Sequence, residues 1–266
     1  MPSARRNLQP IFALGAGVAA WSLFEAQWLE LREIEVPMEG LPEELDGFTV
    51  LHLSDFHLGT ISFNGRALER AVAWAEREEV DVVALTGDLV SRRRGVGLLR
   101  CALPRLRARH GVYAVLGNHD IDGGLVRGAG AVLLQDSSVV VEARGRRIQI
   151  AGGDPRPDWK TRALERLADR DADLRVLLFH FPDVTQWLPG GSYDLVLAGH
   201  LHGGQICVPT PRGKVRLEHL RAAHWEGLHR TAAGLLHVSR GTGTSFVPFR
   251  FLARPEATRL VLRSTR

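Results

Sequence analysis

Short apolar runs alternate with amphipathic stretches along most of this chain, and the alternation predicts its secondary structure. Leu68, Ala71, Val72 and Ala75 have the spacing of a helix with one buried face. The apolar runs have the length of buried strands and occupy residues 48–53, 82–85, 112–116, 176–179, 195–198, 235–238 and 260–262. Strands that alternate with helices predict a layered α/β domain with the helices on the outside.

Two further segments predict a hairpin and a second helix. Residues 139–141 and 148–151 are apolar and flank the sequence Arg-Gly-Arg-Arg, so they predict two antiparallel strands joined by a turn. A second helix is expected around Ala163, Leu164 and Leu167. The chain contains no internal repeat and no low-complexity segment. We therefore expect one continuous domain after the N-terminal segment.

The N-terminal segment differs in pattern from the rest of the chain. Arg5 and Arg6 precede 18 uncharged residues, 7–24, which is the lower limit of length for a helix that spans a bilayer. The surrounding sequence Ala-Arg-Arg-Asn-Leu loosely resembles a twin-arginine export signal, but no convincing cleavage site of the small-x-small type follows it. We expect residues 1–30 to form an uncleaved membrane anchor or signal-like helix, and residues 31–266 to form the main domain.

The charge pattern also predicts an orientation. Two arginines before an apolar segment keep the N-terminus in the cytoplasm, so we expect the main domain on the extracytoplasmic side of the membrane. The cytoplasmic face is the alternative location. The segment is also compatible with a helix that lies in the membrane interface or docks on the domain.

Composition excludes several classes of protein. The 266 residues are 45% hydrophobic and 24% charged, which is typical of a soluble globular domain and excludes a disordered chain, a collagen and a polytopic membrane protein. The net charge of +4 fits attraction to phosphates or to an anionic membrane surface. Two cysteines, Cys101 and Cys207, are too few for a disulfide framework or a cysteine-ligated zinc site.

Polar side chains follow five of the predicted strands at the point where each strand ends. Ligands of open α/β sheets bind beyond the carboxyl ends of the strands, so we expect these side chains to converge on one cleft. The seven oxygen and nitrogen donors are Asp55, His57, Asp88, Asn118, His180, His200 and His202. Seven donors suit two ions better than one, and mixed imidazole and carboxylate donors favour Zn, Fe or Mn. Two such ions clamp the attacking and leaving oxygens of a phosphoryl transfer.

The order of these donors along the chain resembles that of a known family. The chain has five blocks in order: Asp55-x-His57, Gly87-Asp88, Gly117-Asn118-His119-Asp120, His180 and Gly199-His200-x-His202. Each block alone is common by chance, but the ordered set resembles the calcineurin-like metallophosphoesterase superfamily. The sequences around residues 53–59 and 199–206 are similar to its branch of bacterial membrane-associated or exported phosphodiesterases. The likeness reaches from about residue 30 to the end of the chain.

The resemblance implies a four-layer α-β-β-α sandwich with two divalent metal ions between its sheets. The family pattern assigns one ion to Asp55, His57 and His202, the other to Asn118, His180 and His200, and the bridging position to Asp88. It also implies that a hydroxide shared by the two ions attacks phosphorus in line. His119 is expected to act on the substrate, by stabilising the transition state or protonating the leaving oxygen.

One departure from the family narrows the expected reaction. Protein phosphatases of this superfamily carry Gly-Asp-x-Val-Asp-Arg-Gly, and Ser91 stands here in place of the second Asp, which orients the catalytic histidine. A serine cannot supply the same charge to an imidazolium, so a protein phosphatase is disfavoured. We expect a metal-dependent phosphoesterase, more specifically a phosphodiesterase, with a lipid-linked or envelope phosphate ester as substrate.

Several alternatives remain open at this level. One is an enzyme like the UDP-2,3-diacylglucosamine pyrophosphatases of lipid A synthesis, and another is a non-catalytic scaffold on the same fold. Sequence-specific nucleic-acid binding is not expected, because no recognition helix or aromatic-basic motif is present. Arg92, Arg93 and Arg94 either hold a substrate phosphate or form a solvated basic loop. Asp120 is expected to be a hydrogen-bond partner of a ligand or a cap, rather than a metal ligand.

Overall fold

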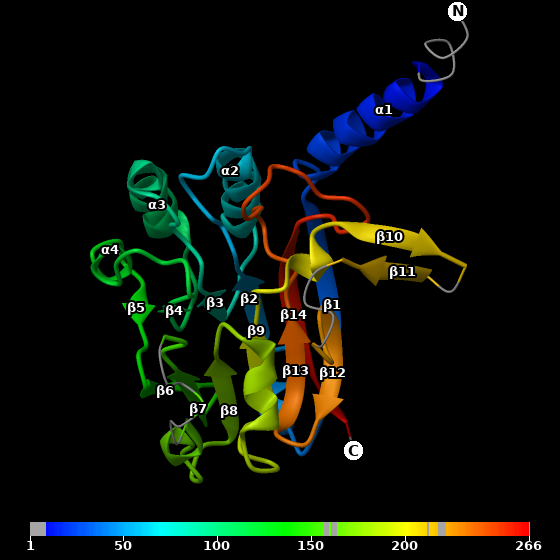
Figure 1. Ribbon diagram of the computed structural model, residues 1–266. Coiled ribbons are helices and arrows are strands. Elements are labelled where there is room, and N and C mark those ends of the chain that lie inside the picture. The colour runs from blue at the N-terminus through cyan, green and yellow to red at the C-terminus, as the bar shows by residue number, and fades with distance from the viewer. Residues whose placement is uncertain (1–8, 157–159, 161–163, 212, 218–221, 266) are drawn as a thin grey trace, which may run out of the picture.

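Two six-stranded β-sheets lie face to face in the computed structural model of the chain (Figure 1). The structure describes residues 9–156, 160, 164–211, 213–217 and 222–265. The first sheet contains, in spatial order, β1 (Glu30–Glu39), β14 (Glu256–Thr265), β2 (Thr49–Leu53), β3 (Val82–Thr86), β4 (Val112–Val115) and β5 (Val132–Leu133). The second contains β12 (Gly227–Thr231), β13 (Gly234–Val238), β9 (Leu195–Ala198), β8 (Leu174–Leu178), β7 (Arg146–Gly152) and β6 (Ser137–Ala143). A separate hairpin is formed by β10 (Cys207–Thr210) and β11 (Gly213–Arg216).

The apolar layer between the sheets explains why they pack together. Val82 and Ala84 of β3 share one buried cluster with Val176 and Leu178 of β8. Because successive side chains of a strand point to opposite faces, the intervening residues of β3 belong to a second buried cluster under the outer helices. Burial on both faces accounts for the uninterrupted apolar runs of these strands.

Helical segments cover the outer faces of both sheets. The first sheet is covered by α2 (Asn64–Ala75), α3 (Val96–Ala102) and α4 (Gly124–Arg127) (Figure 1). Among the described residues, the second sheet is covered by two short 3-10 segments, η5 (Leu164–Leu167) and η6 (Pro182–Gln186). Further 3-10 segments are η1 (Glu43–Leu45), η2 (Arg93–Gly95), η3 (Leu103–Arg105) and η7 (His202–Gly204). The expected four-layer α/β sandwich is confirmed, and the described part of its fourth layer consists of short 3-10 segments.

Most elements lie where the hydrophobic pattern predicts them. All the apolar runs form strands, and the predicted hairpin is the antiparallel pair β6 and β7. The helix expected around Leu164 and Leu167 is wrong in type, because only a 3-10 turn forms there, and Ala163 lies outside the described residues. Strand β1 is not predicted locally, since half of its ten residues are charged. It pairs in parallel with β14, from the other end of the chain.

Helix α1 (Gln9–Glu25) projects away from the sheets (Figure 1). Its described residues up to Trp21 are exposed although most are apolar, whereas Ser22 and Glu25 are buried. The backbone N–H of Arg250 donates to the carbonyl oxygen of Ser22 at 3.0 Å, and that of Ala253 donates to Oε1 of Glu25 at 2.7 Å. Only the C-terminal end of α1 is therefore attached to the domain.

Residues 1–30, which we expect to anchor the chain in a membrane, are described from residue 9 onward. Arg5 and Arg6 lie outside the described residues. Within the described part of the chain, no helix combines the length and the apolar character needed to cross a bilayer.

Candidate metal centre

The polar residues that follow the central strands of both sheets gather at one edge of the sandwich. β2, β3 and β4 of the first sheet and β8 and β9 of the second are each followed by one or more of the seven predicted donors. Two groups have donor atoms that all lie within 4.8 Å of one another: Asp55, His57 and His202, and Asp88, His180 and His200. Asn118 adjoins the second group. The structure therefore brings all seven residues together.

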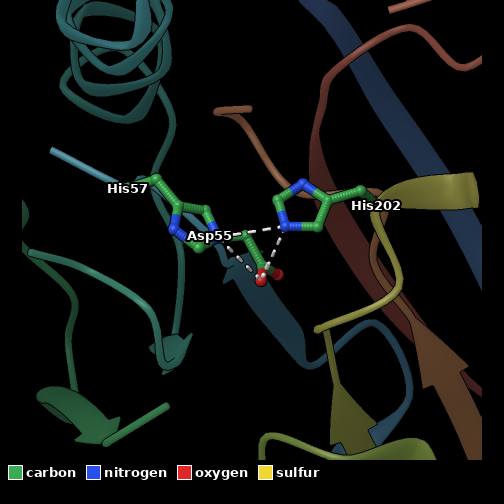
Figure 2. Close-up of side chains that lie close together, drawn as sticks. All are labelled: Asp55, His57 and His202. Carbon is green, nitrogen blue, oxygen red and sulfur yellow. Dashed lines mark hydrogen bonds and ion pairs between the residues drawn. The ribbon is translucent and has the colours of Figure 1, made fainter. Parts of the chain in front are cut away.

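In the first group, two histidines approach the carboxylate of Asp55 from different sheets (Figure 2). Nε2 of His202 lies 3.4 Å from Oδ1 of Asp55, and Nε2 of His57 lies 3.8 Å from it. The two Nε2 atoms are 3.0 Å apart. Nδ1 of His57 is hydrogen-bonded to Oγ of Ser91 at 2.8 Å, and the Ser54 hydroxyl donates to Oδ2 of Asp55 at 2.6 Å. These outer contacts hold the side chains of His57 and Asp55 in place.

His180 lies at the centre of the second group. Its Nδ1 donates to the carbonyl oxygen of Thr86 at 2.8 Å, which leaves a lone pair on Nε2 of the neutral ring. Nε2 faces Oδ1 of Asn118 at 3.1 Å and Oδ2 of Asp88 at 3.3 Å. The ring of His200 is 5.0 Å from that of His180, centroid to centroid. Nε2 of His180 and the two oxygens that it faces all carry lone pairs. They therefore need a proton or a metal cation between them.

Asp88 lies between the two groups. Its Oδ2 is 3.4 Å from Nε2 of His57 and 3.3 Å from Nε2 of His180. Its Oδ1 accepts a hydrogen bond from the backbone N–H of His119 at 2.8 Å. One carboxylate is thus within reach of donors from both groups, as a bridging ligand has to be.

The backbone at these donors is held in an unfavourable conformation. Asp55, His57, Asp88, His200 and His202 all have φ between 45° and 73°. Positive φ is costly for residues that carry a Cβ, and such strain is concentrated at functional sites.

Two glycines allow the close approach of the loops that carry these residues. A Cβ on Gly117 would overlap Oδ1 of Asp88, and a Cβ on Gly199 would overlap Oδ2 of Asp55. This lack of space explains why a glycine precedes Asn118 and His200 in the sequence.

Burial works against charge throughout the site. It raises the pKa of Asp55 to about 6, lowers the pKa of His57 to about 4, and holds the pKa of His202 well below its ordinary value. Burial also disfavours the charged forms of His180 and Asp88, but the attraction between these two residues outweighs it. The pKa of His180 therefore rises to about 9, and the pKa of Asp88 falls. The carboxylates of Asp55 and Asp88 beside the neutral imidazoles of His57 and His202 fit divalent cations, which compensate the carboxylate charge and bind imidazole lone pairs.

The two residues that follow Asn118 have separate surroundings. His119 is half-buried, and its ring lies 5.4 Å from that of His57, centroid to centroid. Asp120 accepts hydrogen bonds from the backbone N–H groups of Val90 and Gly117, both at 2.8 Å. Asp120 thus binds the backbone after two strands, and neither of the two groups of clustered donor atoms includes it.

A cavity of about 530 Å³ opens beside the two groups of donors. Its polar lining includes His57, Asn118, His119, Ser91, Arg92 and Arg94. Arg93 is not part of this lining. Ile61, Ile121 and Phe246 add an apolar part to the same wall. The cavity can therefore receive a molecule that has both an anionic and an apolar part.

Sequence reasoning missed one polar residue of the site, Arg250. It is fully buried, and its Nη1 donates to the carbonyl oxygen of His202 at 3.1 Å. The available signal was a lone arginine inside the largely apolar sequence Phe-Val-Pro-Phe-Arg-Phe-Leu. Cys207 is a buried small side chain, and both cysteines are free.

Comparison with known proteins gives consistent matches. A family model described as calcineurin-like phosphoesterase matches residues 48–204. The metallophosphoesterase YkuE of Bacillus subtilis is 30% identical, over 94% of this chain and 91% of its own length. The phosphodiesterase YaeI of Escherichia coli is 27% identical, over 98% of this chain and 100% of its own length. A Danio rerio protein named transmembrane protein with metallophosphoesterase domain is 31% identical, over 90% of this chain and 58% of its own length.

A solved structure supports the fold. The NAD nucleotidase NadN of Haemophilus influenzae matches with a TM-score of 0.50 and 13% identity, over 74% of this chain and 45% of its own. The chain thus spans less than half of that structure, and the likeness concerns the fold alone. The comparisons favour neither the nucleotide-sugar pyrophosphatase nor the non-catalytic scaffold.

Proposed function

Because this chain belongs to the calcineurin-like phosphoesterase family, and is therefore a metal-dependent hydrolase of phosphoric esters, we propose that it acts on phosphodiesters. The observation that carries the metal-dependent chemistry is the position of Asp88, whose Oδ2 lies within 3.4 Å of histidines from both groups of donors. Ser91, which bonds to His57 instead of orienting His119, argues against a protein phosphatase. The relative YaeI is named a phosphodiesterase.

The proposed roles follow the two groups of donors. Asp55, His57 and His202 are assigned to one metal ion and Asn118, His180 and His200 to the other, with Asp88 as the bridge. When bound, two divalent cations supply a water molecule of lowered pKa as the nucleophile and neutralise charge on the phosphoryl oxygens. These donors do not distinguish among Zn, Fe and Mn.

The protein side chains hold the reacting groups in position. The half-buried ring of His119 lines the cavity next to Asn118, where it can donate a proton to the leaving oxygen or stabilise the transition state. Its backbone N–H is fixed by Oδ1 of Asp88, so the position of the imidazole is tied to the bridging carboxylate. Arg92 and Arg94 line the same cavity and are suited to forked hydrogen bonds with phosphate oxygens.

Hydrolysis of two model esters tests this function. Metal-depleted protein is reloaded with Mn or Zn and assayed with bis(p-nitrophenyl) phosphate and p-nitrophenyl phosphate. We expect metal-dependent cleavage with a preference for the diester. Cleavage of the monoester alone would contradict the diesterase assignment. The absence of bound metal in a folded, reloaded protein would contradict the assigned metal centre.

We also propose that residues 1–30 attach the domain to a membrane and that the substrate is lipid-linked. The support is the exposed apolar helix α1, joined to the domain only at its C-terminal end, and the name of the Danio rerio relative. The arginine pair at the N-terminus supports an extracytoplasmic position of the domain, 31–266.

Vesicle flotation tests the membrane proposal. The full chain is mixed with vesicles of phosphatidylglycerol and phosphatidylcholine, and we expect it to float with them. A variant with Phe12→Ser, Val18→Ser and Phe24→Ser, all exposed in α1, should stay at the bottom of the gradient. The matched control is Val208→Ser, an exposed apolar residue of β10. Equal flotation of all three proteins would contradict attachment through α1.

A further inference from the structure

We propose that Phe246 selects the substrate, by contacting an apolar ester group attached to the phosphorus that is hydrolysed. The inference rests on the proposed phosphodiesterase function and names a property of its substrate. Three observations support it: the exposed position of the Phe246 ring, the hydrogen bonds that hold its loop, and the presence of both arginine and apolar side chains in the cavity lining.

The ring of Phe246 stands at the mouth of the site, free of the apolar core. It is 85% exposed and lies 5.6 Å from the ring of His119, centroid to centroid, in an edge-to-face arrangement. His119 contacts His57 in turn, so a group that covers Phe246 is close to the donor cluster. Two more exposed apolar side chains, Ile61 and Ile121, line the same cavity.

The backbone before Phe246 is held by Asn64, a buried residue of helix α2. Its Oδ1 accepts from the backbone N–H of Thr244 at 3.0 Å, and its Nδ2 donates to the carbonyl oxygen of Thr244 at 3.0 Å. The same Nδ2 donates to the carbonyl oxygen of His57 at 3.2 Å. One amide therefore ties this loop to a residue of the first donor group.

A second buried amide, Gln205, holds the residues on both sides of Phe246. Its Oε1 accepts from the backbone N–H of Ser245 at 3.0 Å. Its Nε2 lies 3.0 Å from the carbonyl oxygen of Ser245 and 3.4 Å from that of Val247. Phe246 itself has φ of 53°, a conformation unfavourable for a residue with a Cβ. The side-chain amides of Asn64 and Gln205 thus hold the loop around Phe246, whose backbone is strained. Packing of the core does not require this conformation, because the Phe246 side chain is exposed.

The remaining lining indicates what the cavity binds. Arg92 and Arg94 are exposed and suit the phosphate of the substrate, whereas Phe246, Ile61 and Ile121 offer an apolar surface to a neighbouring group. A diester has two groups on phosphorus, one that leaves and one that stays. An apolar group that stays next to phosphorus gains contact with Phe246, and a small polar group does not. The apolar group is either an aromatic ring or an aliphatic chain, and the two are separated below.

Three diesters with the same leaving group test this inference: methyl, hexyl and phenyl p-nitrophenyl phosphate. For the metal-loaded wild-type protein we expect kcat/KM to be about tenfold higher for phenyl or hexyl than for methyl, as contact with one aromatic side chain provides. Phe246→Ala should reduce this ratio to near one, mainly through KM. Phe246→Leu separates the two kinds of apolar group. If the natural group is an aliphatic chain, this variant should still prefer the hexyl ester to the methyl ester. If the natural group is an aromatic ring, the variant should lose the preference for the phenyl ester.

The control variant is Val247→Ala, in the same loop but outside the cavity lining. It should keep the wild-type ratio. Melting temperature and bound metal are measured for each variant, so that loss of folding is separated from loss of selectivity. A second readout does not need turnover: phenylphosphonate should raise the melting temperature of the metal-loaded wild type more than methylphosphonate, and Phe246→Ala should remove the difference.

The two proposals fail in different ways. An unchanged substrate ratio in a folded, metal-loaded Phe246→Ala variant would overturn the role of Phe246 and leave the diesterase function intact. A wild-type protein that binds metal but cleaves none of the three diesters would overturn the diesterase function, and the inference would fall with it. Equal kcat/KM for the three esters in the wild type would overturn the inference alone.

Discussion

The guanidinium of Arg250 is completely buried against His202, with Nη1 at 3.1 Å from the carbonyl oxygen and Nη2 at 3.3 Å from Nδ1. The other donor contacts of Arg250 go to backbone carbonyl oxygens, including those of Gly243 and Ala253. Its own backbone N–H donates to Ser22 at the end of α1. Arg250 therefore contacts the first donor group and the loop that carries Phe246 through its side chain, and the end of α1 through its backbone.

Replacing Arg250 by Met is expected to destabilise the protein by about 3 kcal/mol or more, because several buried carbonyl oxygens lose their donor. Bound metal should also decrease, since His202 loses its support. Urea unfolding of the metal-free protein and elemental analysis of the loaded protein measure the two effects. Arg263→Met is the control: the partly exposed guanidinium near the C-terminal end of β14 pairs with Glu35 at the surface, so the substitution should change stability by less than about 1 kcal/mol. Equal effects of the two substitutions would contradict the role of Arg250.

Asp88→Asn should reduce the bound metal from two ions per chain to one or none and should abolish diester hydrolysis. The amide keeps the shape of the carboxylate but removes the negative charge that a bridging position requires. Asp122→Asn is the matched control, because Asp122 is exposed and its carboxylate accepts a hydrogen bond from the nearby backbone N–H of Gly124. Two metal ions and normal turnover in Asp88→Asn would contradict the bridging assignment.

Gly117→Ala should also lose metal, although it changes no donor. The added Cβ would overlap Oδ1 of Asp88, so the loops after β3 and β4 have to separate. Gly97→Ala provides the contrast: Gly97 is exposed in α3 with nothing near a new Cβ, and alanine there should stabilise the helix by about 0.5–1 kcal/mol. Metal content and melting temperature measure both variants. Normal metal binding by Gly117→Ala would show that the loops can separate without disturbing the site.

A buried histidine pair predicts a loss of stability at acidic pH. Nδ1 of His237 is 2.8 Å from Nδ1 of His52, and both rings are fully buried. Burial lowers the pKa of His237 to about 4, with Glu256 acting in the opposite direction and Arg32 in the same direction as burial. In the unfolded chain the pKa returns to about 6.5. The unfolded state therefore binds more protons between about pH 6.5 and pH 4, and acid favours unfolding.

The expected contribution of His237 is a decrease of about 2 kcal/mol in the free energy of unfolding between pH 7.5 and pH 5. His237→Asn cannot titrate and keeps a hydrogen-bonding group beside His52, so it should show a smaller decrease. Urea unfolding of both proteins at the two pH values measures the difference. The same decrease in wild type and variant would contradict a neutral, buried His237.

Local sequence patterns were sufficient for most of the fold. The central strands carry apolar side chains on both faces, and such runs are readable without tertiary information. Strand β1 was not readable, because its stability comes from pairing with β14 at the far end of the chain. The turn at Leu164 was also misjudged, since an apolar spacing of three and four residues does not distinguish a 3-10 turn from a helix.

The sequence by itself determined which donors are present and in what order, because each one follows a strand whose apolar pattern is local. Only the tertiary structure decided how they are combined. His57 and His202 are 145 residues apart and meet because two sheets pack face to face. Arg250 and Phe246 acquire their places only through contacts with distant segments, including Ser22, Asn64 and Gln205. Such contacts depend on long-range packing and on strained backbone angles, and neither leaves a periodic pattern in the chain.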